Sequence, residues 1–136
     1  MPKVLIVEDD VQLSAMYKTK LEHDGFQVVV ANEGKSGLQL AQNEKPDVIL
    51  LDIMLIDRSY SGLNMLEDLR RTEEGKSTPV LALTNLTNKE VADQARELGV
   101  RDYMIKAMHT PEEVVKKVKE CLQSSPESDS NRHPLE

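Results

Sequence analysis

Five short apolar runs recur along the chain, and segments with the apolar spacing of a helix separate them. The runs are rich in Val, Ile and Leu without strict alternation of polar and apolar residues, which indicates strands covered on both faces. We place these strands at residues 4–7, 26–31, 48–51, 80–83 and 103–105. Strands and helices that alternate in this way predict an α/β fold, a doubly wound five-stranded parallel sheet with right-handed crossovers and helices on both faces.

Capping signals predict where the last two helices begin. Thr87 and Glu90 have the spacing of a capping box at the start of the fourth helix. Thr110 and Glu113 repeat that spacing before the fifth helix, where Pro111 suits the first helical position. Both helices are therefore expected to start directly after a threonine.

Length and composition favour a single domain. The chain has 136 residues, and we place the domain at 1–123. The segment 124–136 is polar and is predicted to be a disordered tail, whose final Leu135-Glu136 pair could come from cloning.

Several classes of protein are disfavoured by the same composition. No stretch approaches the roughly 20 apolar residues of a membrane helix, and the single cysteine, Cys121, cannot build a disulfide framework. The expected location is therefore the cytoplasm. A formal net charge of −7 without a basic cluster argues against direct binding of nucleic acid.

Polar residues stand where the predicted strands end. Glu8 and Asp9 follow the first strand, Asp52 the third, Thr84 the fourth and Lys106 the fifth. Ligands of an open parallel sheet bind at the carboxyl ends of its strands, so these side chains are expected to converge. Carboxylates that share a pocket repel one another unless a cation compensates, and Mg²⁺ prefers oxygen ligands. The pattern predicts a magnesium site suited to a phosphoryl group on a carboxylate.

Four segments carry a resemblance to a known family. "LIVEDD", "VILLD", "PVLALT" and "DYMIK" resemble, in order and spacing, the motifs of the CheY-like receiver domain of two-component response regulators. The resemblance implies a flavodoxin-like sheet with strand order 2-1-3-4-5. It also implies that Asp52 accepts a phosphoryl group from a histidine kinase or phosphotransfer protein. Mg²⁺ would be held by Asp9, Asp52 and the backbone carbonyl of Met54, and by Glu8 mainly through a bound water.

The resemblance also implies a switch. Lys106 and Thr84 would contact the phosphoryl group, and Tyr103 would rotate from an exposed to a buried position. The surface of the fourth helix, fifth strand and fifth helix would then change for an unknown output partner; a dimer through that surface stays open. Such a domain is not an enzyme in the ordinary sense, because it catalyses only its own phosphorylation and dephosphorylation.

Four positions depart from the family pattern. Ile56 stands where proline is usual, and Gly62 arrives two residues late, so the loop after the acceptor is expected to be longer and less rigid. Ala107 replaces the proline after Lys106, which predicts either a trans bond with a shifted start of the fifth helix or a strained cis bond. Asn85 is bulkier than the usual residue and is expected to slow access of water or donors to Asp52.

Other interpretations compete with this one. Glu8 to Asp10 could be a solvated turn in which Asp10 caps the first helix, and Tyr103 could be an ordinary residue at the edge of the core. A flavodoxin-type carrier would need a phosphate loop after the first strand, and a haloacid-dehalogenase-type phosphatase would need an acid at Met54. The alternative that remains open is a degenerate receiver, a docking module that works without phosphorylation.

Overall fold

The computed structural model describes residues 2–55, 59–85 and 89–123. The predicted tail at 124–136, the capping residue Thr87 and the position of Ile56 lie outside the described residues.

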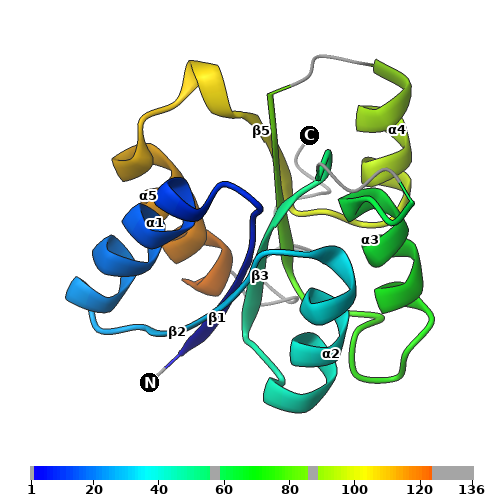
Figure 1. Cartoon of the computed structure of the whole chain (residues 1–136), viewed down its shortest axis with the longest axis horizontal. Coiled ribbons are helices and arrows are strands. Elements are labelled where there is room, and N and C mark those ends of the chain that lie inside the picture. The colour runs from blue at the N-terminus through cyan, green and yellow to red at the C-terminus, as the bar shows by residue number, and fades with distance from the viewer. Residues whose placement is uncertain (1, 56–58, 86–88, 124–136) are drawn as a thin grey trace, which may run out of the picture.

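Five parallel strands form a single sheet in the order β2-β1-β3-β4-β5 (Figure 1). Neighbouring strands are in register, so that Val7 lies beside Leu51 and Leu51 beside Ala82. The carboxyl ends of the strands therefore meet at one edge of the sheet. The strands are β1 (Lys3–Val7), β2 (Gln27–Ala31), β3 (Val48–Asp52), β4 (Val80–Thr84) and β5 (Asp102–Ile105).

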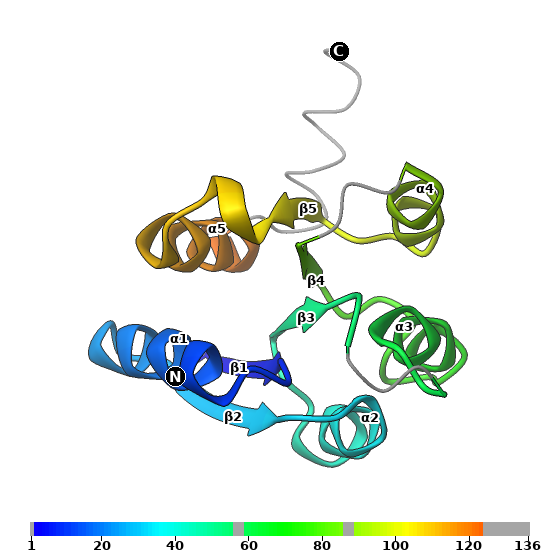
Figure 2. The same ribbon diagram turned by 45° about the horizontal axis from the view of Figure 1, so that its top comes forward.

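Helices cover both faces of the sheet. Figure 2 shows α1 and α5 side by side on one face and α2, α3 and α4 on the other. The helices are α1 (Val11–His23), α2 (Gly34–Glu44), α3 (Gly62–Arg70), α4 (Lys89–Glu97) and α5 (Pro111–Gln123), with a short 3-10 helix (Lys106–Met108) between β5 and α5. The predicted doubly wound fold is confirmed.

The core consists of two layers that the strands keep apart. Leu5 and Val7 pack on the side of α2, α3 and α4, whereas Val4 and Ile6 pack on the side of α1 and α5. Successive side chains of a strand point to opposite faces, so a strand buried on both faces needs an apolar residue at every position. This requirement explains the unbroken apolar runs in the sequence.

Helix ends follow the predicted capping signals where they can be seen. Thr110 Oγ1 accepts a hydrogen bond from the Glu113 amide at 3.2 Å, and Glu113 Oε1 accepts one from the Thr110 amide at 2.8 Å. This reciprocal pair is the predicted capping box of α5. Gly25 and Gly99 end the turns after α1 and α4 with φ of 95° and 79°, values that favour glycine.

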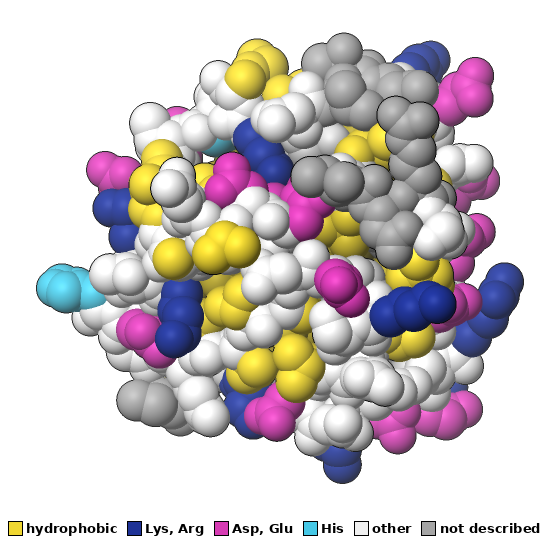
Figure 3. Space-filling view, viewed as in Figure 1, with side chains coloured by type: hydrophobic (Ala, Val, Ile, Leu, Met, Phe, Trp, Pro, Cys, Tyr) yellow, Lys and Arg dark blue, Asp and Glu magenta, His cyan; other side chains and the backbone are white. Residues whose placement is uncertain are grey.

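None of the helices in the described part of the chain is long and apolar enough to span a bilayer. The face seen in Figure 3 carries acidic, basic and apolar side chains intermixed among the residues described there.

Candidate functional site

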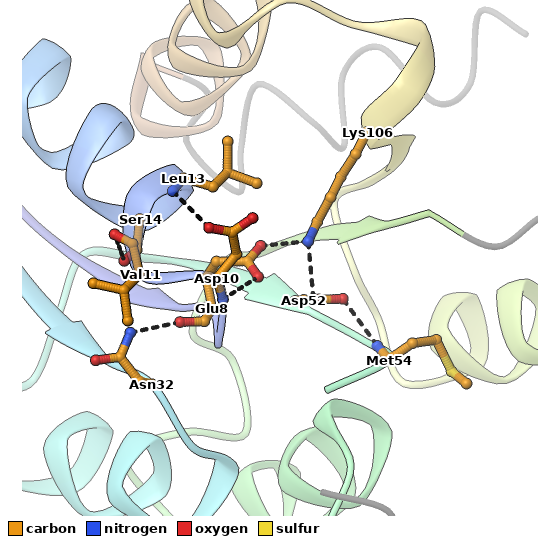
Figure 4. Close-up of polar contacts among 9 residues, drawn as sticks. All are labelled: Glu8, Asp10, Val11, Leu13, Ser14, Asn32, Asp52, Met54 and Lys106. Carbon is orange, nitrogen blue, oxygen red and sulfur yellow. Dashed lines mark hydrogen bonds and ion pairs between the residues drawn. The ribbon is translucent and has the colours of Figure 1, made fainter. Parts of the chain in front are cut away.

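The carboxyl edge of the sheet gathers the five polar residues expected there. Asp52 and Thr84 are the last residues of β3 and β4, Lys106 follows β5 directly, and Glu8 and Asp9 follow β1. Parallel strands in register place these chain positions side by side although they are far apart in the sequence. Figure 4 shows Lys106 reaching from the end of β5 toward Glu8 and Asp52.

Three carboxylates form a compact cluster at this edge. Glu8, Asp9 and Asp52 each offer an oxygen, and these oxygens lie within 4.8 Å of one another. Glu8 and Asp52 are buried, at 2% and 5% exposure, and Asp9 is half-buried. A set of carboxylate oxygens at this spacing fits a hard divalent cation such as Mg²⁺, which commonly takes one or two carboxylates and keeps several waters.

Lys106 compensates part of this negative charge. Its Nζ lies 2.5 Å from Glu8 Oε1 and 2.9 Å from Asp52 Oδ2. Burial raises the pKa of Glu8 to about 7, and the hydrogen bond from Lys106 acts in the opposite direction. Burial also disfavours the charged form of Lys106, but the bonds to Glu8 and Asp52 outweigh it and raise the pKa of the lysine. Lys106 therefore stays charged between the two acids.

Backbone groups hold the acids in place. The Met54 amide donates to Asp52 Oδ1 and the Asp10 amide donates to Glu8 Oε2, both at 3.0 Å. Asp10 Oδ1 accepts from the Leu13 amide and caps α1. The capping interpretation of Asp10 is thus correct, while Glu8 and Asp9 belong to the cluster rather than to a solvated turn.

Asn32 is a contributor that the sequence reasoning missed. Its side-chain amide donates to the backbone carbonyl of Glu8 at 2.7 Å, and the Glu8 amide donates to the Ala31 carbonyl at 3.0 Å. Asn32 directly follows β2, the strand beside β1 (Figure 4). The strand-end rule that selected the other residues would have identified it as well.

Thr84 and Tyr103 lie next to the cluster, toward α4. Thr84 is fully buried, and Tyr103 is half-buried and packs against the core layer beneath α2, α3 and α4. Burial raises the pKa of Tyr103, while the charge of Arg96 and the hydroxyl of Thr84 oppose this rise. Tyr103 thus occupies an inward position near Thr84.

A cavity of about 280 Å³ opens beside Lys106 on the α1 and α5 side. Its wall includes Asp10, Tyr17, Asn85 and His109, and Asn85 is exposed. The Lys106–Ala107 peptide bond is trans, and the chain makes a 3-10 turn there before α5 begins at Pro111. Of the two alternatives for this bond, the strained cis form is therefore wrong.

Hydrogen bonds hold the described residues just before α3, which form the end of the loop that follows β3. Ser61 caps α3 in a capping box with Asn64, and the Tyr60 hydroxyl donates to Asp68 at 2.6 Å. Gly62 lies so close to β3 that a Cβ there would meet the Asp52 carbonyl oxygen at 2.0 Å. Gly62 stands two residues later than in the family pattern, but it still lies directly against the backbone of Asp52.

Comparison with known proteins agrees with this geometry. The sequence profile described as the response regulator receiver domain matches residues 4–119. This chain belongs to that family. The receiver domain is 34% identical over 123 residues to the alkaline phosphatase synthesis transcriptional regulatory protein PhoP of Bacillus subtilis, covering 90% of this chain and 49% of the relative. The transcriptional regulatory protein CpxR of Escherichia coli is 34% identical over 125 residues, covering 92% and 51%. The chain thus spans about half the length of these relatives.

Solved structures show the same fold. The Vibrio cholerae chemotaxis protein CheY4 matches the receiver domain with a TM-score of 0.81 and 29% identity, over 90% of this chain and 99% of that one. A CheY-like receiver domain protein from Methanospirillum hungatei matches with a TM-score of 0.83 and 26% identity, over 96% and 98%. The expected family and strand order are confirmed.

Proposed function

We propose that this receiver domain accepts a phosphoryl group on Asp52 from a histidine kinase or phosphotransfer protein, with Mg²⁺ as cofactor. The observation that carries the proposal is the setting of Asp52: a buried carboxylate, 2.9 Å from Lys106 Nζ, inside a cluster of three acids. A loop carboxylate without a function would be expected in solvent, not buried beside a lysine and two other acids. Phosphorylation then alters the surface of α4, β5 and α5 and so regulates an output partner.

The acidic cluster would hold the metal. Asp9, Asp52 and the backbone carbonyl of Met54 are the proposed direct ligands, and Glu8 acts through a bound water. Bound Mg²⁺ supplies positive charge that balances the phosphoryl oxygens during transfer. Because Asp52 and Glu8 are buried, the same charge also reduces the repulsion among the acids.

The residues of the chain perform the transfer by position and charge. An Asp52 carboxylate oxygen attacks the phosphorus of the phosphohistidine, a new P–O bond forms, and the P–N bond breaks as the imidazole leaves with the electron pair. Lys106 moves its contact from the carboxylate to a phosphoryl oxygen. The Met54 amide, already directed at Asp52 Oδ1, keeps the acceptor in orientation.

Thr84, Tyr103 and Asn85 carry the proposed response. The Thr84 hydroxyl donates a hydrogen bond to a phosphoryl oxygen, and Tyr103, which already lies inward, stays packed behind Thr84, so the state of Asp52 is transmitted to α4 and β5. Asn85 lies on the wall of the cavity beside Lys106 and limits the approach of water and donors. The net charge of −7 and the mixed charges in Figure 3 support a protein partner rather than nucleic acid.

Intact mass spectrometry after incubation with acetyl phosphate or phosphoramidate, with and without Mg²⁺, tests the proposal. The wild type should gain one phosphoryl group only with Mg²⁺, and Asp52→Ala should gain none. Glu67→Ala removes an exposed acid of α3 and is the matched control that should phosphorylate normally. Absence of both phosphorylation and Mg²⁺ binding in the wild type would favour the degenerate docking module instead; Mg²⁺ binding without phosphorylation would implicate Asn85 and the altered loop.

A further inference from the structure

An arginine of α4 covers the ring of Tyr103. The guanidinium carbon of Arg96 lies 5.7 Å from the centroid of the ring, within the range of a cation–π contact. Arg96 also contacts Asp93, one turn earlier on the same helix, at 3.4 Å. The guanidinium group is thus held over the ring by its own helix, while most of the arginine side chain stays exposed.

The hydroxyl of Tyr103 does not explain why the ring lies inward. The hydroxyl oxygen is buried, and although the Thr84 hydroxyl lies near it, no hydrogen bond of acceptable geometry reaches it from the residues that the structure describes. A buried hydroxyl without such a partner disfavours the inward position. Packing of the ring against the core and the contact with Arg96 must therefore outweigh that cost.

We propose that Arg96 is a positioning residue that holds Tyr103 in its inward orientation beside Thr84. The contact joins two of the three elements of the proposed α4, β5 and α5 surface, because Arg96 belongs to α4 and Tyr103 to β5. A change in the orientation of α4 would then strengthen or weaken the contact that keeps Tyr103 inward. In the other direction, an inward Tyr103 would favour the orientation of α4 in which Arg96 covers its ring. The role of this coupling in signalling rests on the proposed function of Asp52. The contact between Arg96 and Tyr103 is independent of that function.

The reactivity of the Tyr103 ring tests this inference. Nitration with tetranitromethane, located by peptide mass spectrometry and corrected for the phenolate fraction of each tyrosine from ultraviolet titration, reports how often each ring is accessible, and Tyr17 and Tyr60 serve as internal references. Arg96→Gln should raise the nitration rate of Tyr103 by roughly two- to fivefold, the change expected when a contact of this kind is lost. The rates of the two reference tyrosines should not change.

Two further variants separate the contact with the ring from the general effect of removing a positive charge from α4. Lys89→Gln removes the same charge from the exposed start of α4, away from the ring, and should leave Tyr103 as in the wild type. Arg96→Lys restores the charge and should recover part of the protection. An unchanged rate at Tyr103 in Arg96→Gln, or an equal rise in Lys89→Gln, would overturn the inference, and so would a rise at all three tyrosines, which would mean general loosening.

The measurement is made without Mg²⁺ or a phosphoryl donor. Failure of the proposed phosphorylation would appear only as a missing mass gain on Asp52, whereas failure of the present inference would appear only in the nitration of Tyr103. The two outcomes are therefore distinguishable.

Discussion

Gly62 shows how one residue can secure the acceptor. It begins α3 directly against the end of β3, where an added Cβ would lie 2.0 Å from the Asp52 carbonyl oxygen and 2.8 Å from the Ile53 Cα. Both neighbours are backbone atoms, so they cannot move aside by changing a rotamer. The Leu63 amide also donates to the Ile53 carbonyl at 3.2 Å, which closes the loop onto the strand.

Gly62→Ala should therefore destabilise the domain and disturb Asp52. We expect a loss of about 2 to 3 kcal/mol in the free energy of unfolding, the usual cost of overpacking, measured by urea denaturation. Phosphorylation of Asp52 by acetyl phosphate should slow as well. Gly25→Ala is the control: its φ of 95° causes strain of about 1 to 2 kcal/mol, yet it has open space for a Cβ and should leave phosphorylation unchanged. Equal effects of the two substitutions on phosphorylation would contradict the role assigned to Gly62.

At the scale of elements, α1 and α5 pack as a pair and are joined by ion pairs at their surface. Lys119 of α5 lies 2.7 Å from Asp24, the residue that follows α1, and Lys20 lies 3.6 Å from Glu112. The hydrogen bond from Lys119 holds the pKa of Asp24 below its ordinary value of 3.8. Because the folded state favours the ionised form, the pair stabilises the fold above pH 3.8, and this contribution disappears as the pH falls through the lowered pKa.

Asp24→Asn should therefore lower stability in a way that depends on pH. The difference in thermal midpoint between wild type and Asp24→Asn should be present at pH 7, be reduced by added salt, and vanish under strongly acidic conditions. Lys119→Gln should show the same pH profile, and the double variant should lose no more than either single one. A difference that persists unchanged at acid pH would show that ionisation of Asp24 is not the cause.

At the scale of the whole molecule, Arg70 connects two segments near the amino-terminal edge of the sheet, the loop before β4 and the turn after α4. The Nε of Arg70 donates to the Leu98 carbonyl at 2.6 Å, and its terminal nitrogens donate to the carbonyls of Gly75, Thr78 and Gly99 at 2.7, 2.8 and 3.3 Å. These four acceptors belong to the loop before β4 and the turn after α4. One side chain at the end of α3 thus fixes where β4 begins and where α4 ends.

Arg70→Met should weaken this junction. The four carbonyls would lose a charged donor, and we expect a cost of about 2 to 4 kcal/mol in the free energy of unfolding, measured by urea denaturation. Arg71→Met is the matched control, because Arg71 is the next residue, is largely exposed and, within the described part of the chain, forms a local ion pair with Asp68; its cost should stay within about 0.5 kcal/mol. Equal destabilisation by both substitutions would argue against the junction.

The amino-acid sequence by itself determined the sheet and the strand-end residues. Apolar runs without alternating polar residues specify strands that are buried on both faces. A parallel sheet then brings the residues that follow its strands to one edge, whatever segments connect the strands. Glu8, Asp9, Asp52, Thr84 and Lys106 could therefore be selected before their distances were known. Their metal-binding and phosphoryl-transfer roles stay predictions.

Only the tertiary structure decided which side chains meet. The contact of Arg96 with Tyr103, the bond from Asn32 to the Glu8 carbonyl and the four carbonyls around Arg70 join positions separated by 7, 24 and up to 29 residues. No local pattern encodes such pairs, because they depend on how helices pack on the sheet and on the rotamer that each packed side chain adopts. Periodicity and strand ends are repeated along the chain and can be read from it, whereas a distance between two side chains exists only once the layers are assembled.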